Sequence, residues 1–214
     1  MNKKFIFGLI SVAVVLLFWF FAKPPLEDLW SRFMDFVNPR HYSDIVREKW
    51  SNKSSSFLIN KLNHPSIVYS GAATTILRAR NNNTMDETDK IMHIIKNGRN
   101  YRGRYLALSI LFFWDKQKAI DLSMEIIRSG RKHPLYEDAL LHLAHIKYEP
   151  AFPYVIDLAK SPDKYNNGSI MLLEEFGKPE AIPILEEMLK DPNVLRIDKN
   201  AVRDAIKSIK EKNE

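Results

Sequence analysis

The sequence predicts an all-α fold, and three observations support this fold class. Only 7 of the 214 residues are glycine, whereas residue types that favour helices, such as Leu, Ala, Lys and Glu, are plentiful. One pattern of apolar residues at helical spacing recurs about every 30 residues along the chain. A single long apolar run stands near the amino terminus. We therefore expect one membrane helix followed by a domain of repeated helices.

The apolar run covers residues 5–22 without a charged side chain. As a helix it would be roughly 27 Å long, which is close to the thickness of the hydrocarbon core of a bilayer. A cleaved signal peptide is the alternative interpretation. However, its apolar region would normally be shorter, and Phe20 occupies the place of a small residue in the cleavage motif. We therefore interpret residues 1–23 as a transmembrane signal-anchor helix.

Basic residues on the two sides of this run predict its orientation. Lys3 and Lys4 precede it, and Lys23 on the other side is soon followed by Glu27 and Asp28. The positive-inside rule then places the amino terminus in the cytoplasm and the rest of the chain outside it. In a Gram-negative cell this is a single-pass inner-membrane protein with a periplasmic domain. The flanking lysines also supply part of the net charge of +6, so the remainder is too mildly basic to indicate nucleic acid.

Residues 24–42 form an amphipathic connector that begins with Pro24 and Pro25. Its apolar residues lie at helical spacing: Leu26, Leu29, Trp30, Phe33, Met34 and Val37. Two interpretations are open. The apolar stripe either lies in the membrane interface or covers the exposed end of the helical domain.

Four segments share the repeated pattern, and they begin near Lys90, Lys118, Glu149 and Pro179. Pro153 and Pro183 fall on the same position of this pattern. Each segment is preceded by another apolar helix, which begins near Ser66, Tyr105, Tyr136 or Ser169. We expect Asp86 to precede the first of the four segments, Pro150 and Pro179 to start helices, and Gly98 and Gly130 to end them. Such short helices are stable only when paired and stacked on neighbours.

This pattern resembles the short HEAT-like repeats of bacterial proteins. The resemblance covers about residues 43–210 and is clearest in the segment GKPEAIPILEEML at 177–189. It implies that residues 43–214 form a right-handed α-solenoid of about four to five helix pairs. Such an architecture is typical of binding proteins and does not identify a reaction.

Alignment of the four segments yields two columns of polar residues. One contains His93, Glu125, Asp157 and Glu187, and the other, three residues later, contains Lys96, Arg128, Lys160 and Lys190. One interpretation is a solvated surface on which an acid and a base three apart form local ion pairs. The other is that these helices line the inner face of the solenoid and the columns contact a protein partner.

A basic edge is predicted at the turns beside these columns. It consists of Arg99, Arg102, Arg104, Arg131 and Lys132, with Tyr101 and Tyr105 interleaved. An anionic lipid surface and an acidic protein are the partners that such an edge suits. A solvated turn is the alternative, and nucleic acid is not an expected partner outside the cytoplasm.

No motif for catalysis or for a cofactor is found in the sequence. Cysteine is absent, and no phosphate-binding loop or nucleophile motif occurs. His142 and His145 are three residues apart, but the surrounding leucines favour packing over metal binding. We expect no metal and no cofactor, and we do not expect an enzyme.

The function that the sequence favours is therefore a non-catalytic, membrane-tethered module for protein–protein interaction. A scaffold, an assembly factor and an immunity-type inhibitor of a toxin all fit this class. An enzyme or enzyme-associated HEAT-like subunit, and a structural protein of the membrane surface, are the alternatives.

Overall fold

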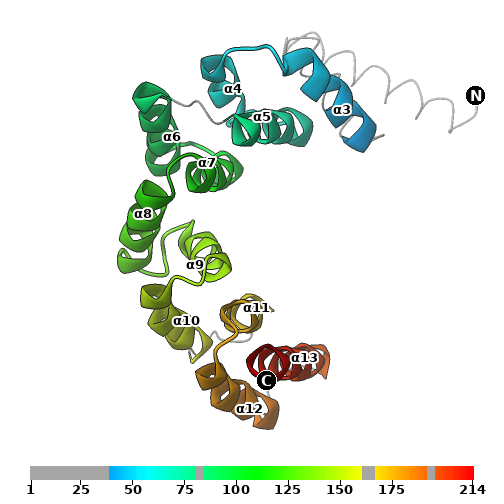
Figure 1. Cartoon of the computed structure of the whole chain (residues 1–214), viewed down its shortest axis with the longest axis vertical. Helices are drawn as coiled ribbons and strands as arrows, with labels where there is room; N and C mark the ends of the chain where they lie inside the picture. Colours follow the sequence, from blue (N-terminus) through cyan, green and yellow to red (C-terminus); the bar gives the residue numbers. More distant parts are fainter. Residues whose placement is uncertain (1–38, 81–83, 161–166, 192–195) are drawn as a thin grey trace, which may run out of the picture. The chain divides into compact units, whose positions relative to one another are not determined.

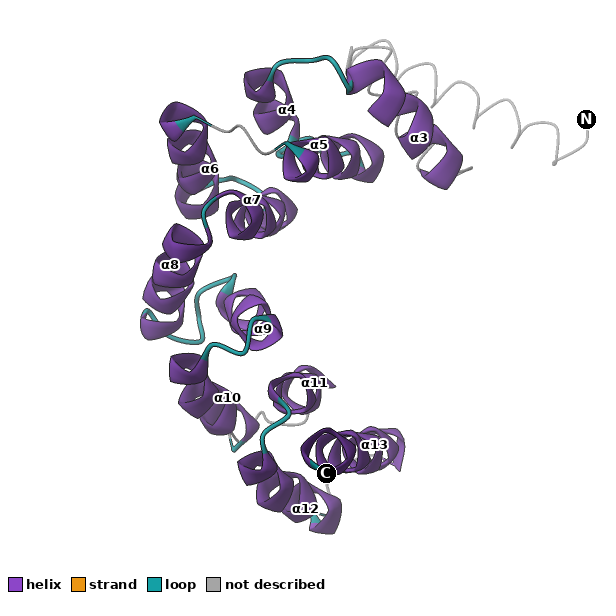
Figure 2. Ribbon diagram, viewed as in Figure 1, coloured by secondary structure: helices purple, strands orange, loops and turns teal. Residues whose placement is uncertain are grey.

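The computed structural model describes residues 39–80, 84–160, 167–191 and 196–214, and all regular secondary structure in these ranges is helical (Figures 1 and 2). The all-α prediction is confirmed for this part of the chain. The predicted anchor at 1–23 and residues 24–38 of the connector lie outside the described residues. Among the helices that are described, none combines the length and the apolar character needed to cross a membrane.

The chain divides into two compact units, Met1–Ala79 and Arg80–Glu214. This division falls inside residues 43–214, which the repeat pattern treats as one domain. The described part of the first unit consists of α3 (Pro39–Trp50), α4 (Ser55–Lys61) and α5 (Ile67–Ala79). The last four residues of the predicted connector thus already belong to α3.

Helix α5 packs against both α3 and α4 in the first unit. Trp50, at the end of α3, is buried at their junction. The centroid of its ring lies 5.2 Å from that of Phe57 and 4.9 Å from that of Tyr69. These aromatic contacts join all three helices, since Phe57 belongs to α4 and Tyr69 to α5.

The described part of the second unit contains eight α-helices and two single turns of 3-10 helix, η1 (Glu149–Ala151) and η2 (Pro179–Ala181). The helices are α6 (Met85–Asn97), α7 (Tyr101–Trp114), α8 (Lys116–Arg128), α9 (Tyr136–His145), α10 (Phe152–Ala159), α11 (Asn167–Phe176), α12 (Ile182–Lys190) and α13 (Arg196–Asn213).

These helices form two layers within the second unit. Helices α7, α9, α11 and α13 pack directly on one another in chain order and form the odd-numbered layer. Figure 1 shows α6, α8, α10 and α12 as the second, even-numbered layer, on the outer side of the bend of this unit. Helix α6 packs along α7, α8 along α9, α10 along α11, and α12 along α13.

Capping groups explain where several of these helices begin. The Thr84 hydroxyl accepts a hydrogen bond from the Glu87 N–H (3.2 Å), and the Glu87 carboxylate accepts one from the Thr84 N–H (2.9 Å). Helix α6 therefore starts after Thr84. The prediction that Asp86 precedes this helix is wrong, because Asp86 lies in its first turn, where it pairs with Lys90 (2.6 Å).

The predicted proline and glycine signals are confirmed. Pro150 and Pro179 lie in the 3-10 turns that lead into α10 and α12. Gly98 is the C-cap residue of α6. Gly130 directly follows the C-cap residue of α8 and has a φ of 99°, a left-handed conformation that glycine adopts without strain.

Both layers of the second unit contribute fully buried side chains to its core. The largest are Ile91, Ile95, Leu108, Ile110, Leu111, Ile127, Leu135, Leu140 and Leu143. Because helices of this length are marginal in isolation, burial between the layers supplies most of their stability.

Candidate functional site

All eight residues of the two predicted columns are exposed on the even-numbered layer. His93 and Lys96 lie on α6, Glu125 and Arg128 on α8, Asp157 and Lys160 at the end of α10, and Glu187 and Lys190 on α12. One of the two interpretations of the columns placed these helices on the inner face, which does not hold for the second unit. The odd-numbered helices pack directly on one another, so theirs is the shorter, inner layer (Figure 1).

Acids of one column pair with cations of the preceding repeat. Lys96 Nζ of α6 lies 3.3 Å from Glu125 Oε2 of α8. After α8, Arg131 Nη2 lies 2.6 Å from Asp157 Oδ2 of α10 and donates a second hydrogen bond to the Asp157 carbonyl oxygen (2.7 Å). Hydrogen bonding to Asp157 raises the pKa of the Arg131 guanidinium.

The local ion pairs that the sequence suggested, with an acid three residues before a base, are therefore not the pairs that form. Glu125 and Asp157 are engaged by cations of the preceding repeat. Arg128, Lys160 and Lys190 make no ion pair with any residue that the structure describes.

The five residues of the predicted basic edge differ in their surroundings. Arg99, Arg102 and Lys132 are exposed and form no ion pair within the described ranges. Arg131 is paired with Asp157. Arg104 is half-buried: its Nε donates to the Ile95 carbonyl oxygen (2.7 Å), and its Nη2 lies 3.2 Å from His133 Nε2. Arg104 thus joins the end of α6 to the turn after α8.

A furrow of about 250 Å³ opens between α6 and α8, beside these cations. We call it the α6–α8 furrow. Its lining residues are Ile95, Lys96, Leu122, Glu125, Ile126, Ser129 and His133. The Lys96–Glu125 ion pair therefore connects the two helices at the furrow. Sequence alignment found Lys96 and Glu125 but gave no indication of a hollow between them.

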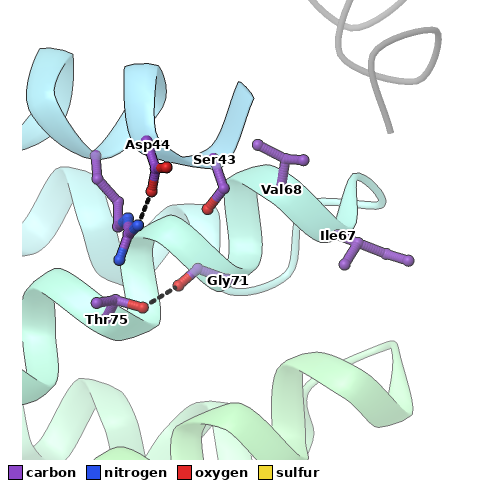
Figure 3. Close-up of a pocket in the computed structure, with 7 residues that line it drawn as sticks. Ser43, Asp44, Ile67, Val68, Gly71 and Thr75 are labelled. Carbon is purple, nitrogen blue, oxygen red and sulfur yellow. Dashed lines mark hydrogen bonds and ion pairs between the residues drawn. The ribbon is translucent and has the colours of Figure 1, made fainter. Parts of the chain in front are cut away.

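A second hollow, of about 480 Å³, lies in the first unit between α3 and α5 (Figure 3). Helix α3 contributes Ser43, Asp44 and Arg47, and α5 contributes Ile67, Val68, Gly71 and Thr75. Asp44 and Arg47 form an ion pair, and the Thr75 hydroxyl donates to the Gly71 carbonyl oxygen (3.0 Å). Apart from the neighbouring backbone of α5 itself, no atom lies within 4 Å of the place where a Cβ of Gly71 would stand, so the absence of a side chain there helps to keep the hollow open. No pattern in the sequence indicates this hollow.

The two histidines considered as metal ligands have different partners. The His142 ring stacks on Phe112 and Tyr105 of α7, with centroids 4.8 Å and 5.9 Å apart. His145 Nδ1 lies 2.8 Å from Glu175 Oε1 of α11. In the described ranges no three His, Asp or Glu residues are grouped as a metal site would require.

The hydrogen bond with His145 lowers the pKa of the Glu175 carboxyl below its ordinary value of 4.5. Because the folded pKa is depressed, the stabilisation is present above the ordinary pKa and is lost as the pH falls through the folded pKa. We expect His145→Ala to remove this contribution, so the difference in unfolding free energy from the unmodified chain should be largest above the ordinary pKa of 4.5 and should shrink as the pH falls below it. Chemical denaturation at a series of pH values measures it. His93→Ala, which removes an exposed histidine from the other layer, is the control and should leave the pH dependence unchanged.

Comparison with protein-family models, with curated proteins and with solved structures gives no match.

Proposed function

We propose that this chain is a membrane-tethered, HEAT-like α-solenoid that binds a protein partner through the even-numbered layer of its second unit. Helix pairs stacked in two layers are the arrangement that such repeat proteins use to build extended binding surfaces. The proposed location is the inner membrane, with residues 1–23 as the anchor and the helical domain outside the cytoplasm. A scaffold, an assembly factor or an immunity-type inhibitor would each use the domain in this way.

The observation that carries the proposal is the exposure of all eight column residues on one layer. Lys96, in one of the columns, and Arg131, beside them, are each paired with an acid of the next repeat. Arg128, Lys160 and Lys190 remain as a row of exposed cations on three successive helices of this layer. Because these cations recur once in each repeat, they favour a partner that binds along the length of the layer.

Affinity capture of the full-length, anchored protein from its native membrane tests this proposal. We expect one specific protein to co-purify with the unmodified chain and to be lost when Arg128→Glu and Lys160→Glu are combined. A rim charge typically changes the association rate and its salt dependence, so the loss should be greatest at low salt, where exposed charges are screened least. Lys207→Glu combined with Lys210→Glu, an equal charge change in the odd-numbered layer, is the control. A partner retained by the double variant would reject this layer as the contact surface.

A further inference from the structure

The α6–α8 furrow combines an apolar floor with a polar rim. Ile95, Leu122 and Ile126 form the floor, with side chains only 1%, 4% and 5% exposed. Lys96 and Glu125 stand at the rim, where they are exposed. A volume of about 250 Å³ is below the range of sites that enclose a whole small-molecule ligand. It suits a single inserted side chain.

Arg104 fixes one side of this furrow. By bonding the Ile95 carbonyl oxygen and approaching His133, it holds the end of α6 against the turn that carries two lining residues, Ser129 and His133. Burial and the nearby Arg104 charge lower the pKa of His133, so this imidazole is neutral at physiological pH. The furrow is thus formed in the absence of a partner, which reduces the entropic cost of binding.

Three exposed cations lie within three residues, along the chain, of residues that line the furrow. Arg99 follows the lining residue Lys96 by three positions, Arg128 precedes Ser129, and Lys132 precedes His133. None of these three makes an ion pair with a described residue. The Lys96–Glu125 ion pair at the rim has both side chains about half exposed or more, at 46% and 65%. Such exposed pairs contribute little to stability, so a carboxylate of a partner can displace Glu125 from Lys96.

We infer that the α6–α8 furrow binds an acidic protein segment, which inserts one apolar side chain between the helices while its carboxylates meet the surrounding cations. The inference rests on the proposed function and names the chemistry of the partner. Charge complementarity selects an acidic segment, and the apolar floor selects a segment with one apolar anchor. An anionic membrane surface would use the cations but would leave the furrow empty.

Selection from a displayed library of random peptides, on the full-length protein in detergent micelles, tests the inference. We expect the selected peptides to share one apolar residue flanked by Asp or Glu. Ser129→Trp should fill the furrow from its rim and weaken their binding about tenfold. Ser129→Ala, which removes the hydroxyl but leaves the furrow open, should bind normally. Ser129 is exposed and has helical backbone angles, and an unchanged circular dichroism spectrum checks that the tryptophan variant folds.

Charge is tested separately with Arg128→Glu, which should also weaken peptide binding about tenfold. Lys190→Glu, on the same layer but outside the furrow, should not. Failure to enrich acidic peptides, or equal binding to the Ser129→Trp variant, would overturn the inference. Binding of phosphatidylglycerol vesicles by the chain without its anchor, sensitive to Arg128→Glu but not to Ser129→Trp, would assign the cations to lipid and would also overturn it. In each of these cases the proposed function would still stand if affinity capture found a partner protein whose binding depends on Lys160.

Discussion

The Leu140→Ala variant is expected to lose about 2–5 kcal/mol of the free energy of unfolding of the second unit. Leu140 is 0% exposed on α9, and this helix contacts α7, α8, α10 and α11. Truncation removes buried apolar surface and leaves a cavity, because tightly packed helices relax only partly around it. Since α9 links both layers, the loss should extend to its neighbours. Guanidinium unfolding of the full chain in detergent, followed by circular dichroism, measures the change.

Leu141→Ala provides a matched control for this variant. Leu141 is the next residue of the same helix and is only half-buried, so the same deletion should cost clearly less. Hydrogen exchange can then locate the loss of protection, which should appear in α7 and α11 as well as in α9. Equal destabilisation by the two substitutions would show that the layers are not packed around Leu140 as described.

Removal of residues 1–23 is expected to release the chain from the membrane completely. If the apolar run at 5–22 is the proposed anchor, the hydrophobic effect holds it in the bilayer, and salt and alkaline washing do not screen this effect. The full-length chain should therefore remain in the membrane pellet after a carbonate wash, and the shortened chain should be soluble. Sedimentation followed by immunoblotting measures both.

The control is a full-length chain that carries Arg99→Glu and Arg102→Glu, which should stay in the pellet if the anchor alone holds the protein. Retention of the shortened chain after the wash would contradict the anchor. Terminal sequencing of the protein in both the membrane and the soluble fraction decides the other alternative, since a mature chain that begins after Ala22 would identify a cleaved signal peptide.

Local features of the fold could be predicted from sequence because they depend on local chemistry. The helical period alone places Glu125 and Arg128 on the exposed side of α8, and both are exposed. Proline at 150 and 179 and glycine at 130 mark helix ends because of their backbone restrictions. The capping box of Thr84 and Glu87 is also a local sequence signal, and it predicts the start of α6 after Thr84.

Contacts between repeats could not be predicted in the same way. The Lys96–Glu125 pair and the furrow beneath it depend on the offset between α6 and α8, which is set by packing against α7 and α9. No sequence pattern indicates which of the two layers is the inner one. The role of Arg104 was missed because its bond to the Ile95 carbonyl oxygen depends on tertiary geometry, whereas its charge suggested an exposed edge.

Chemical cross-linking of lysines in the full-length protein, in its native membrane, tests the central claim most directly. If the even-numbered layer is the binding surface, mass spectrometry should find cross-links to one partner protein at Lys96, Lys160 and Lys190, which are all exposed on that layer. Cross-links to a partner confined to Lys207 and Lys210 of α13, in the odd-numbered layer, would contradict the account, and so would the absence of any partner.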